Sequence, residues 1–293
     1  MNRKWFFPVI SAVFIFSTIL TGCGASLKTA RVATKFGNAL QAQPITSATA
    51  EINCSITTST QGIPADTRFH TVVRSRSDWE VNRSYSDIES TVTDRGKNVS
   101  YTMQVYSTGE SGEQVRYVHL DQMDTWIRLE NQLRPADVDP KLILRLLDQV
   151  SGETDMEVSD NTMGGGIHYI LRLSFTAEEI RSFAESAGIN IPLEFQDCDL
   201  KDVTIPVELE IEDKTFLPIR LQIRLKGMND SMVQALARTF AKGGDVKNLD
   251  IDMDEISLLI TNFSYESQEI PMLPKGAAEN ALDMKKVKEI KNS

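Results

Sequence analysis

Residues 201–226, KDVTIPVELEIEDKTFLPIRLQIRLK, decide the fold of this chain. Apolar and polar residues alternate on both sides of the turn-forming residues 213–215, a pattern typical of two half-buried strands joined into a hairpin. With this turn, Leu209 is expected opposite Ile219, and acidic residues of the first strand then face basic residues of the second. The stretch therefore predicts an antiparallel pair with one dry face and one wet face.

The same period of two recurs along most of the chain. Further strands are expected at 46–59, 67–76, 79–93, 98–107, 115–120, 125–130, 167–173, 249–254 and 256–268. Helices are expected at 26–43, from Asp139, from a capping box of Thr176 and Glu179 to Gly188, and at 231–242. About ten strands with few helices and short connections predict an α+β fold, with a mainly antiparallel sheet covered by helices on one side.

The first 22 residues have the parts of a secretory signal. Arg3 and Lys4 precede an apolar run at 5–20, which is shorter than the roughly 20 residues of a comfortable membrane span. The run ends in Leu20-Thr21-Gly22-Cys23. An ordinary signal with an incidental cysteine, or an uncleaved anchor, would contain the same basic and apolar parts.

This ending resembles the lipobox of bacterial lipoproteins. The resemblance implies that the Cys23 thiol receives a diacylglyceryl group and that the chain is cut just before it. Two acyl chains are sufficient for stable anchoring, whereas one is marginal. The chain is then expected at the outer, extracytoplasmic face of a cell membrane. Its expected organisation is a signal peptide at 1–22, a lipidated N-terminus with a helix at 23–45, a single domain at 46–274 and a polar tail at 275–293.

The charge excludes several kinds of partner. The formal net charge of −10 becomes −12 when Arg3 and Lys4 are removed with the signal. An acidic chain gains nothing from counterion release on a phosphate backbone, so nucleic-acid binding is not expected. The same balance argues against an electrostatic hold on anionic lipid, which leaves attachment to the acyl anchor.

Cys54 and Cys198 remain after lipidation of Cys23. An even pair of cysteines in an oxidising compartment favours a disulfide, which would stabilise the fold by about 4–5 kcal/mol on the chain-entropy model. Two buried free thiols are the alternative.

No group of residues in the sequence predicts catalysis, a metal or a cofactor. His70, His119 and His168 lie far apart and lack zinc-ligand spacing. The acidic run at 250–254 has Glu255 where a calcium loop needs glycine, and its alternation fits a strand better. The chain is therefore expected to be no enzyme.

The order of elements, from lipobox and N-terminal helix to a long meander with inserted helices, resembles the LolA/LolB and LppX-like envelope lipoproteins, including Firmicute families of unknown function. Three segments carry the resemblance: 117–127, 212–218 and 270–274. It implies a strongly curved half-barrel sheet that wraps around helices and leaves a cavity for acyl chains or another hydrophobic ligand.

Two functions follow as hypotheses. In the first, a lipid or other apolar molecule binds between sheet and helices, lined or supported by five inward residues of the hairpin: Ile205, Val207, Leu209, Leu221 and Ile223. The same five would equally well form a closed core. In the second, the chain is a non-catalytic envelope interaction or sensor protein with a filled interior and an exposed apolar patch.

Overall fold

The structure is a computed structural model. It describes residues 27–60, 63–110, 113–130, 157–161, 168–176, 204–226 and 249–283, together with Leu144, Glu178, Glu179 and Arg181. The signal segment, Cys23, Cys198 and the helix expected at 231–242 lie outside this description, as does the helix expected from Asp139 apart from Leu144.

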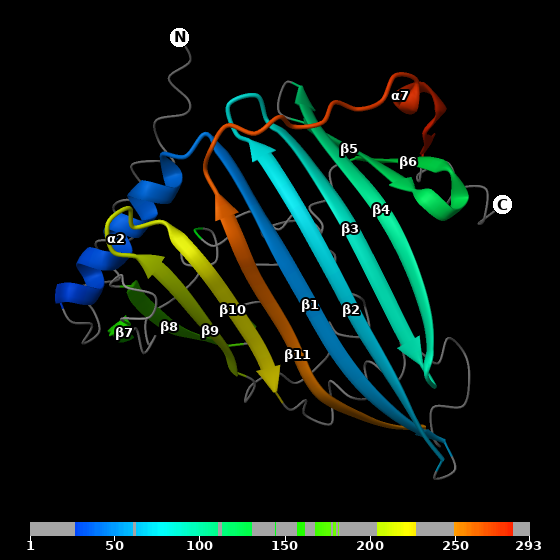
Figure 1. The fold of residues 1–293 in the computed structure, drawn as a ribbon, viewed down its shortest axis with the longest axis horizontal. Coiled ribbons are helices and arrows are strands. Elements are labelled where there is room, and N and C mark those ends of the chain that lie inside the picture. Colours follow the sequence, from blue (N-terminus) through cyan, green and yellow to red (C-terminus); the bar gives the residue numbers. More distant parts are fainter. Residues whose placement is uncertain are drawn as a thin grey trace.

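The described chain consists of strands with a few short helical segments (Figure 1). In chain order these are α2 (Leu27–Gln41), β1 (Ile45–Thr60), β2 (Ile63–Asp78), β3 (Arg83–Asp94), β4 (Lys97–Glu110), β5 (Glu113–Leu120), η2 (Asp121–Met123), β6 (Thr125–Glu130), β7 (Glu157–Asn161), β8 (His168–Thr176), β9 (Thr204–Glu212), β10 (Pro218–Lys226), β11 (Leu249–Ser264), α7 (Ala277–Asn280) and β12 (Leu282–Asp283). Among the described residues, no helix has the length and hydrophobicity of a membrane span.

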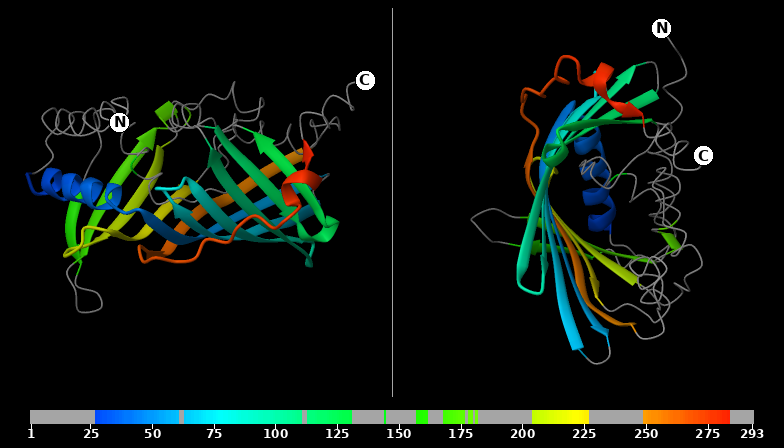
Figure 2. Two further views of the ribbon diagram at one scale, coloured as in Figure 1. Left: turned by 90° about the horizontal axis from the view of Figure 1, so that it is seen from above. Right: turned by 90° about the vertical axis from the view of Figure 1, so that its right-hand side faces the viewer.

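All the strands in the described residues belong to one 12-stranded sheet in the order β12-β6-β5-β4-β3-β2-β1-β11-β10-β9-β8-β7. The neighbours are antiparallel except for β12, which runs parallel to β6. The sheet is strongly curved, and α2 lies on its concave side at the end formed by β7 to β10 (Figures 1 and 2). The expected curved, mainly antiparallel sheet is thus confirmed.

An unbroken row of apolar side chains crosses the concave face. Its members are direct cross-strand neighbours on β5, β4, β3, β2, β1, β11, β10, β9 and β8: Leu120, Met103, Ile88, Val73, Ala50, Ile260, Leu221, Leu209 and Leu171. These residues share one hydrophobic cluster with α2. The row forms because period-two alternation places every second side chain of each strand on the same face.

Helix α2 contributes Val32, Phe36 and Leu40 to this cluster, at the spacing that aligns side chains on one helix face. The helix ends before Pro44, which cannot donate a backbone hydrogen bond. The helix predicted at 26–43 is therefore confirmed and shown to occupy the concave side of the sheet.

The hairpin of β9 and β10 confirms the predicted faces and corrects the predicted register. Leu209 lies opposite Leu221 rather than Ile219. The connection is longer than a three-residue turn: Phe216 has φ of 57°, its N–H donates to the Glu212 carbonyl (3.0 Å), and a bulge follows at Pro218. A shift of two residues leaves Leu221 and Ile223 on their predicted face, because the side-chain period is two. Before the bulge the pattern differs, since Pro218 is buried opposite Ile211.

Other element boundaries also differ from the sequence predictions. The two strands expected at 249–254 and 256–268 form one strand, β11, with an irregularity opposite Ser55 and Ile56 of β1. Residues 79–82 are a turn rather than the start of β3. The break expected around Gly62 is shorter, because Ile63 and Pro64 already belong to β2. The sequence predicted neither β7 nor β12, and β12 lies in the expected polar tail.

Local turn and capping predictions agree with the structure. Arg95 and Gly96 both have positive φ between β3 and β4, which suits a two-residue hairpin turn. At the end of β8, the Thr176 N–H donates to Glu179 Oε2 (2.8 Å) and the Glu179 N–H donates to Thr176 Oγ1 (3.2 Å). This reciprocal pair is the predicted capping box.

Candidate functional site

The concave face offers apolar surface beyond the end that α2 occupies. Met103, Leu120 and Ile127, on β4, β5 and β6, pack against the core cluster but are only partly buried. They point to the same side of the sheet as α2 and lie toward the opposite end of the strand order. This arrangement can bind an apolar molecule through contacts that need no particular hydrogen bond.

The five hairpin residues expected to line or support a cavity all lie on this face. Val207 pairs with Ile223, and Leu209 pairs with Leu221. Val207, Leu209 and Leu221 are buried in the core cluster, whereas Ile205 and Ile223 are half-buried. The structure thus brings the five together; their contact with a ligand stays a prediction.

A second row on the concave face is polar. It crosses β1, β2, β3, β4 and β5 as direct cross-strand neighbours: Thr46, Ser77, Ser84, Ser107 and Arg116. All but Ser84 are buried. A row between the polar and apolar rows contains Ala48, Ser75, Ser86, Val105 and Val118.

Arg116 is the charged member of this polar row, and its side chain is only 3 % exposed. It pairs across the sheet with Ser107, whose hydroxyl is buried and has no hydrogen-bond partner among the described residues. At the other end of the row, Trp79 Nε1 donates to Thr46 Oγ1 (3.1 Å). The face therefore combines a buried positive charge with hydroxyl groups beside an apolar surface.

The convex face carries a separate aromatic cluster. The Tyr85 and Tyr106 ring centroids are 4.8 Å apart, and Trp126 lies 5.7 Å from Tyr106. Ile270 and Leu273, in the segment after β11, pack against these rings. That segment crosses the convex side of the sheet on its way to α7 (Figure 1). Strands β3 to β6 therefore carry apolar side chains on both faces of the sheet.

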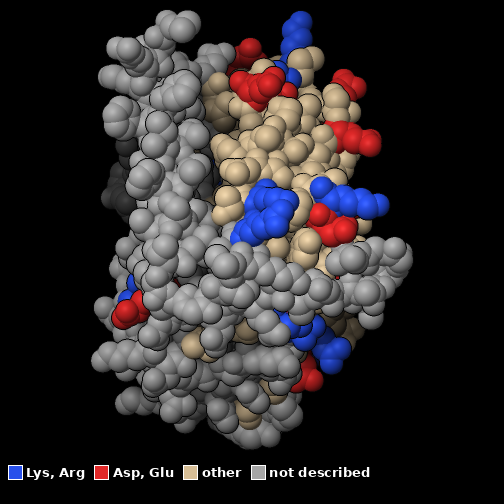
Figure 3. All heavy atoms as spheres, turned by 90° about the vertical axis from the view of Figure 1, so that its left-hand side faces the viewer, with Lys and Arg blue, Asp and Glu red and all other residues tan. Residues whose placement is uncertain are grey.

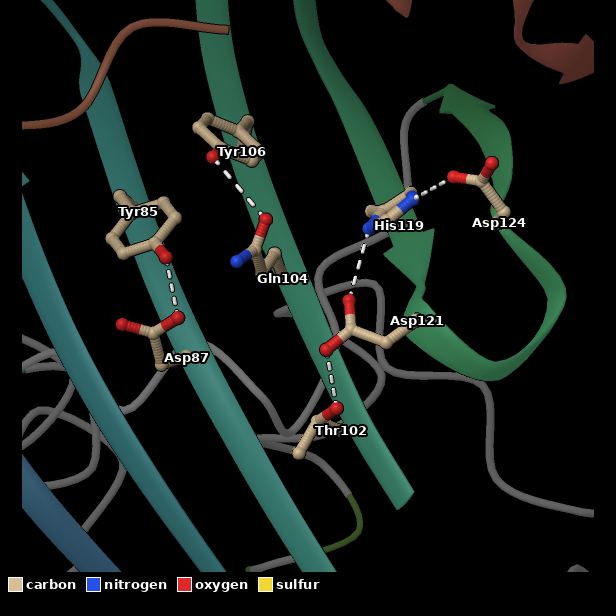
Figure 4. A network of polar contacts seen from close by, with 8 residues as sticks. All are labelled: Tyr85, Asp87, Thr102, Gln104, Tyr106, His119, Asp121 and Asp124. Atoms are coloured by element: carbon tan, nitrogen blue, oxygen red, sulfur yellow. Dashed lines mark hydrogen bonds and ion pairs between the residues drawn. The ribbon is translucent and has the colours of Figure 1, made fainter. Parts of the chain in front are cut away.

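Polar contacts surround this cluster (Figure 4). The Tyr85 hydroxyl donates to Asp87. Burial and, to a smaller extent, this hydrogen bond raise the pKa of Tyr85 above its usual range. His119 lies between Asp121 (3.0 Å) and Asp124 (3.3 Å).

The Thr102 hydroxyl donates to Asp121 rather than to His119. Asp121 and Asp124 flank the turn between β5 and β6, so these contacts link that turn to Thr102 on β4 and to His119 on β5.

Strands β8 to β10 carry ion pairs on the convex face. Arg172 Nε lies 3.3 Å from Glu208, Arg220 lies 3.9 Å from the same carboxylate, and His168 Nδ1 lies 2.9 Å from Glu210. Figure 3 views the side of the molecule where these strands lie, and basic and acidic side chains stand next to one another on its described surface. The two arginine pairs are partly exposed, and such pairs set the register more than they add stability.

The remaining candidate residues are brought together only in part. His70, His119 and His168 lie on β2, β5 and β8, and the described part of the chain contains no group of three or more residues suited to hold a metal ion. Cys54 is half-buried on β1, and burial raises the pKa of its thiol. Since Cys198 is outside the described residues, the disulfide stays a prediction.

Sequence reasoning missed the polar row. On β2, Arg74 and Arg76 alternate with Ser75 and Ser77 and are exposed, which is a signal that the serines point inward. Arg116 offered no such signal, because β5 has apolar residues on both faces.

No protein-family model matches the chain, and no curated protein is similar to it. Among solved structures, a DUF1329 family protein from Desulfovibrio piger is 12 % identical, with a TM-score of 0.23, over 84 % of this chain and 93 % of that one. A beta-barrel-like protein with a domain of unknown function, DUF1849, from Brucella abortus is 10 % identical, with a TM-score of 0.24, over 75 % and 95 %. Similarity at this level supports no argument about function.

Proposed function

We propose that the chain is an extracytoplasmic lipoprotein, anchored by lipid on Cys23, and that the concave face of its sheet binds a lipid or another hydrophobic molecule. One observation carries this proposal: the apolar row continues past α2 onto β4 and β5, where Met103 and Leu120 remain partly exposed, as does Ile127 on the same face of β6. A curved sheet with such a face is what the resemblance to LolA/LppX-like lipoproteins implies. In this proposal the chain acts by binding and carries out no covalent chemistry.

The proposed anchor also determines where binding takes place. Helix α2 begins at Leu27, only four residues after Cys23. A chain extends by at most about 3.6 Å per residue, so the helix would begin within roughly 14 Å of the acylated cysteine. The domain would then stay close to its membrane and would exchange ligand with that membrane rather than over a long distance.

Anchoring is tested by metabolic labelling with an alkyne-bearing palmitate in a bacterial host. The wild-type chain is expected to incorporate label and to partition into the detergent phase, and Cys23→Ser is expected to do neither. Equal labelling or equal partitioning of the two chains would remove the anchor from the proposal.

Binding is tested by extraction of lipid from the purified full-length chain, followed by mass spectrometry. Met103→Glu places a charge on the concave face and is expected to remove most of the bound lipid, because a charge next to an acyl chain is strongly unfavourable. Gln104→Glu is the matched control, since the next residue points to the convex face. Equal lipid content in both variants would contradict binding on the concave face.

A second candidate, a non-catalytic interaction or sensor protein, is favoured by a different observation. Met272 is 77 % exposed in the segment that covers the convex aromatic cluster. A partner would bury this side chain. Crosslinking in intact cells is the test: Met272→Ser should abolish a specific adduct and leave lipid content unchanged. An adduct that persists in the variant would exclude this surface.

A further inference from the structure

The polar row on the concave face is the feature that the proposed function leaves unexplained. An acyl chain needs no charge, yet Arg116 is buried on the same face as the apolar row. Removing a guanidinium from water is unfavourable unless anionic or polar groups surround it. Arg116 takes part in a further interaction, and because a guanidinium has five N–H donors, a ligand can bind to it alongside that interaction.

Ser107 provides the second, independent observation. It is the direct cross-strand neighbour of Arg116, it is 2 % exposed, and its hydroxyl has no hydrogen-bond partner among the described residues. Buried hydroxyl groups almost always have a partner, so an unsatisfied one indicates a group that is still to be supplied. A guanidinium and a hydroxyl side by side both donate hydrogen bonds to an oxyanion.

Ser107 and Arg116 lie at one end of the apolar surface, where a polar headgroup would be needed. On β4, Val105 and Met103 lie two and four residues before Ser107 and point to the same face of the sheet. Since a strand rises about 3.3 Å per residue, Met103 lies roughly 13 Å from Ser107. On β5, Arg116, Val118 and Leu120 repeat the sequence of polar, buried apolar and partly exposed apolar positions.

We propose that Arg116 and Ser107 bind the anionic headgroup of an amphiphilic ligand, a carboxylate or a phosphate, whose apolar chain lies along β4 and β5 toward Met103 and Leu120. This inference rests on the proposed function and specifies the ligand class of the same face. The ligand is therefore an anionic lipid rather than a neutral one.

The test uses membranes that carry the full-length chain and two photoreactive probes of equal length, a 16-carbon fatty acid and the corresponding fatty alcohol. The wild type is expected to crosslink the acid at least about tenfold more than the alcohol, the size of effect expected for hydrogen bonds to a charged group. Arg116→Gln should bring the two yields together by loss of acid labelling. Arg172→Gln, on the exposed convex face, is the matched control and should behave as wild type.

Ser107→Ala covers the case in which Arg116→Gln does not fold. This variant keeps the charge and nearly the same volume, and it is expected to lower acid labelling about threefold while alcohol labelling is unchanged. Unchanged acid labelling in Ser107→Ala would overturn the inference.

The remaining outcomes separate the two proposals. Equal labelling of the wild type by acid and alcohol overturns the headgroup site and leaves lipid binding intact. Labelling by neither probe overturns the proposed function and the headgroup site with it. If inorganic phosphate alone suppresses acid labelling as strongly as unlabelled fatty acid does, the site binds free anions, and the amphiphile is excluded.

Discussion

Replacement of Leu209 and Leu221 tests the core and the register of the β9–β10 hairpin together. The two side chains are 0 % and 2 % exposed and lie directly opposite each other. Truncation to alanine removes their burial and leaves a cavity, so each single variant is expected to lose about 2–5 kcal/mol of unfolding free energy.

The double variant carries the information on register. Because Leu209 and Leu221 share one contact, their combined loss should differ from the sum of the single losses by roughly 0.5–3 kcal/mol. The register expected from the sequence alone pairs Leu209 with Ile219. With that register, the larger coupling free energy would be measured between Leu209 and Ile219. Ile219 is half-buried and lies next to the bulge at Pro218, so its coupling to Leu209 should be the smaller one.

Urea unfolding of the purified chain, followed by tryptophan fluorescence, measures these differences. Val99→Ala is the control, since Val99 is 64 % exposed and its truncation should change stability by no more than about 0.5 kcal/mol. A loss below about 1 kcal/mol for Leu221→Ala, or a stronger coupling of Leu209 to Ile219, would refute the reasoning.

Three further predictions concern local features, and each is measured by denaturation. Gly96→Ala should destabilise by about 1 kcal/mol, because Gly96 has φ of +75°, whereas Gly37→Ala in the open interior of α2 should stabilise by about 0.5–1 kcal/mol; changes of the same sign would contradict this. Thr176→Ala should cost about 0.5–2 kcal/mol through loss of the capping box with Glu179, and no loss would exclude that role. Burial raises the pKa of Tyr265, so the neutral phenol stabilises the fold fully below the unfolded pKa of about 10, and this stabilisation is lost as the pH rises further. The unfolding free energy of Tyr265→Phe should therefore fall less above that pH than that of the wild type. An equal fall in both chains would show that Tyr265 is not responsible.

The sequence predicts the faces of strands better than their partners. In β9 and β10 the alternation places Leu209 and Leu221 inside, and the structure confirms it. The register depends on the connection, and the left-handed conformation of Phe216 has no signature in a residue of that type. The two-residue strand β12 is set by its contact with β6 and is too short for any periodicity to show.

Residues of the candidate site could be predicted from the sequence only in strands with one apolar face. The inward residues of the β9–β10 hairpin were found because charged residues mark the outer face of that hairpin. On β5 both Tyr117 and Val118 are at least half-buried, on opposite faces. Hydrophobicity alone could not decide which face Arg116 joins, because the convex cluster over β3 to β6 depends on Ile270 and Leu273, far along the chain.

The pairing of β1 with β11 has a consequence for how the chain folds. These two strands form the middle of the sheet, and Ala50 meets Ile260 there, roughly two hundred residues later in synthesis. Strands β2 to β6, and strands β8 to β10, can associate locally beforehand, but the centre closes only when nearly the whole polypeptide has been made. We therefore expect the nascent chain to remain incompletely folded until β11 has been synthesised. An incompletely folded chain is the form that passage through a secretion pore requires.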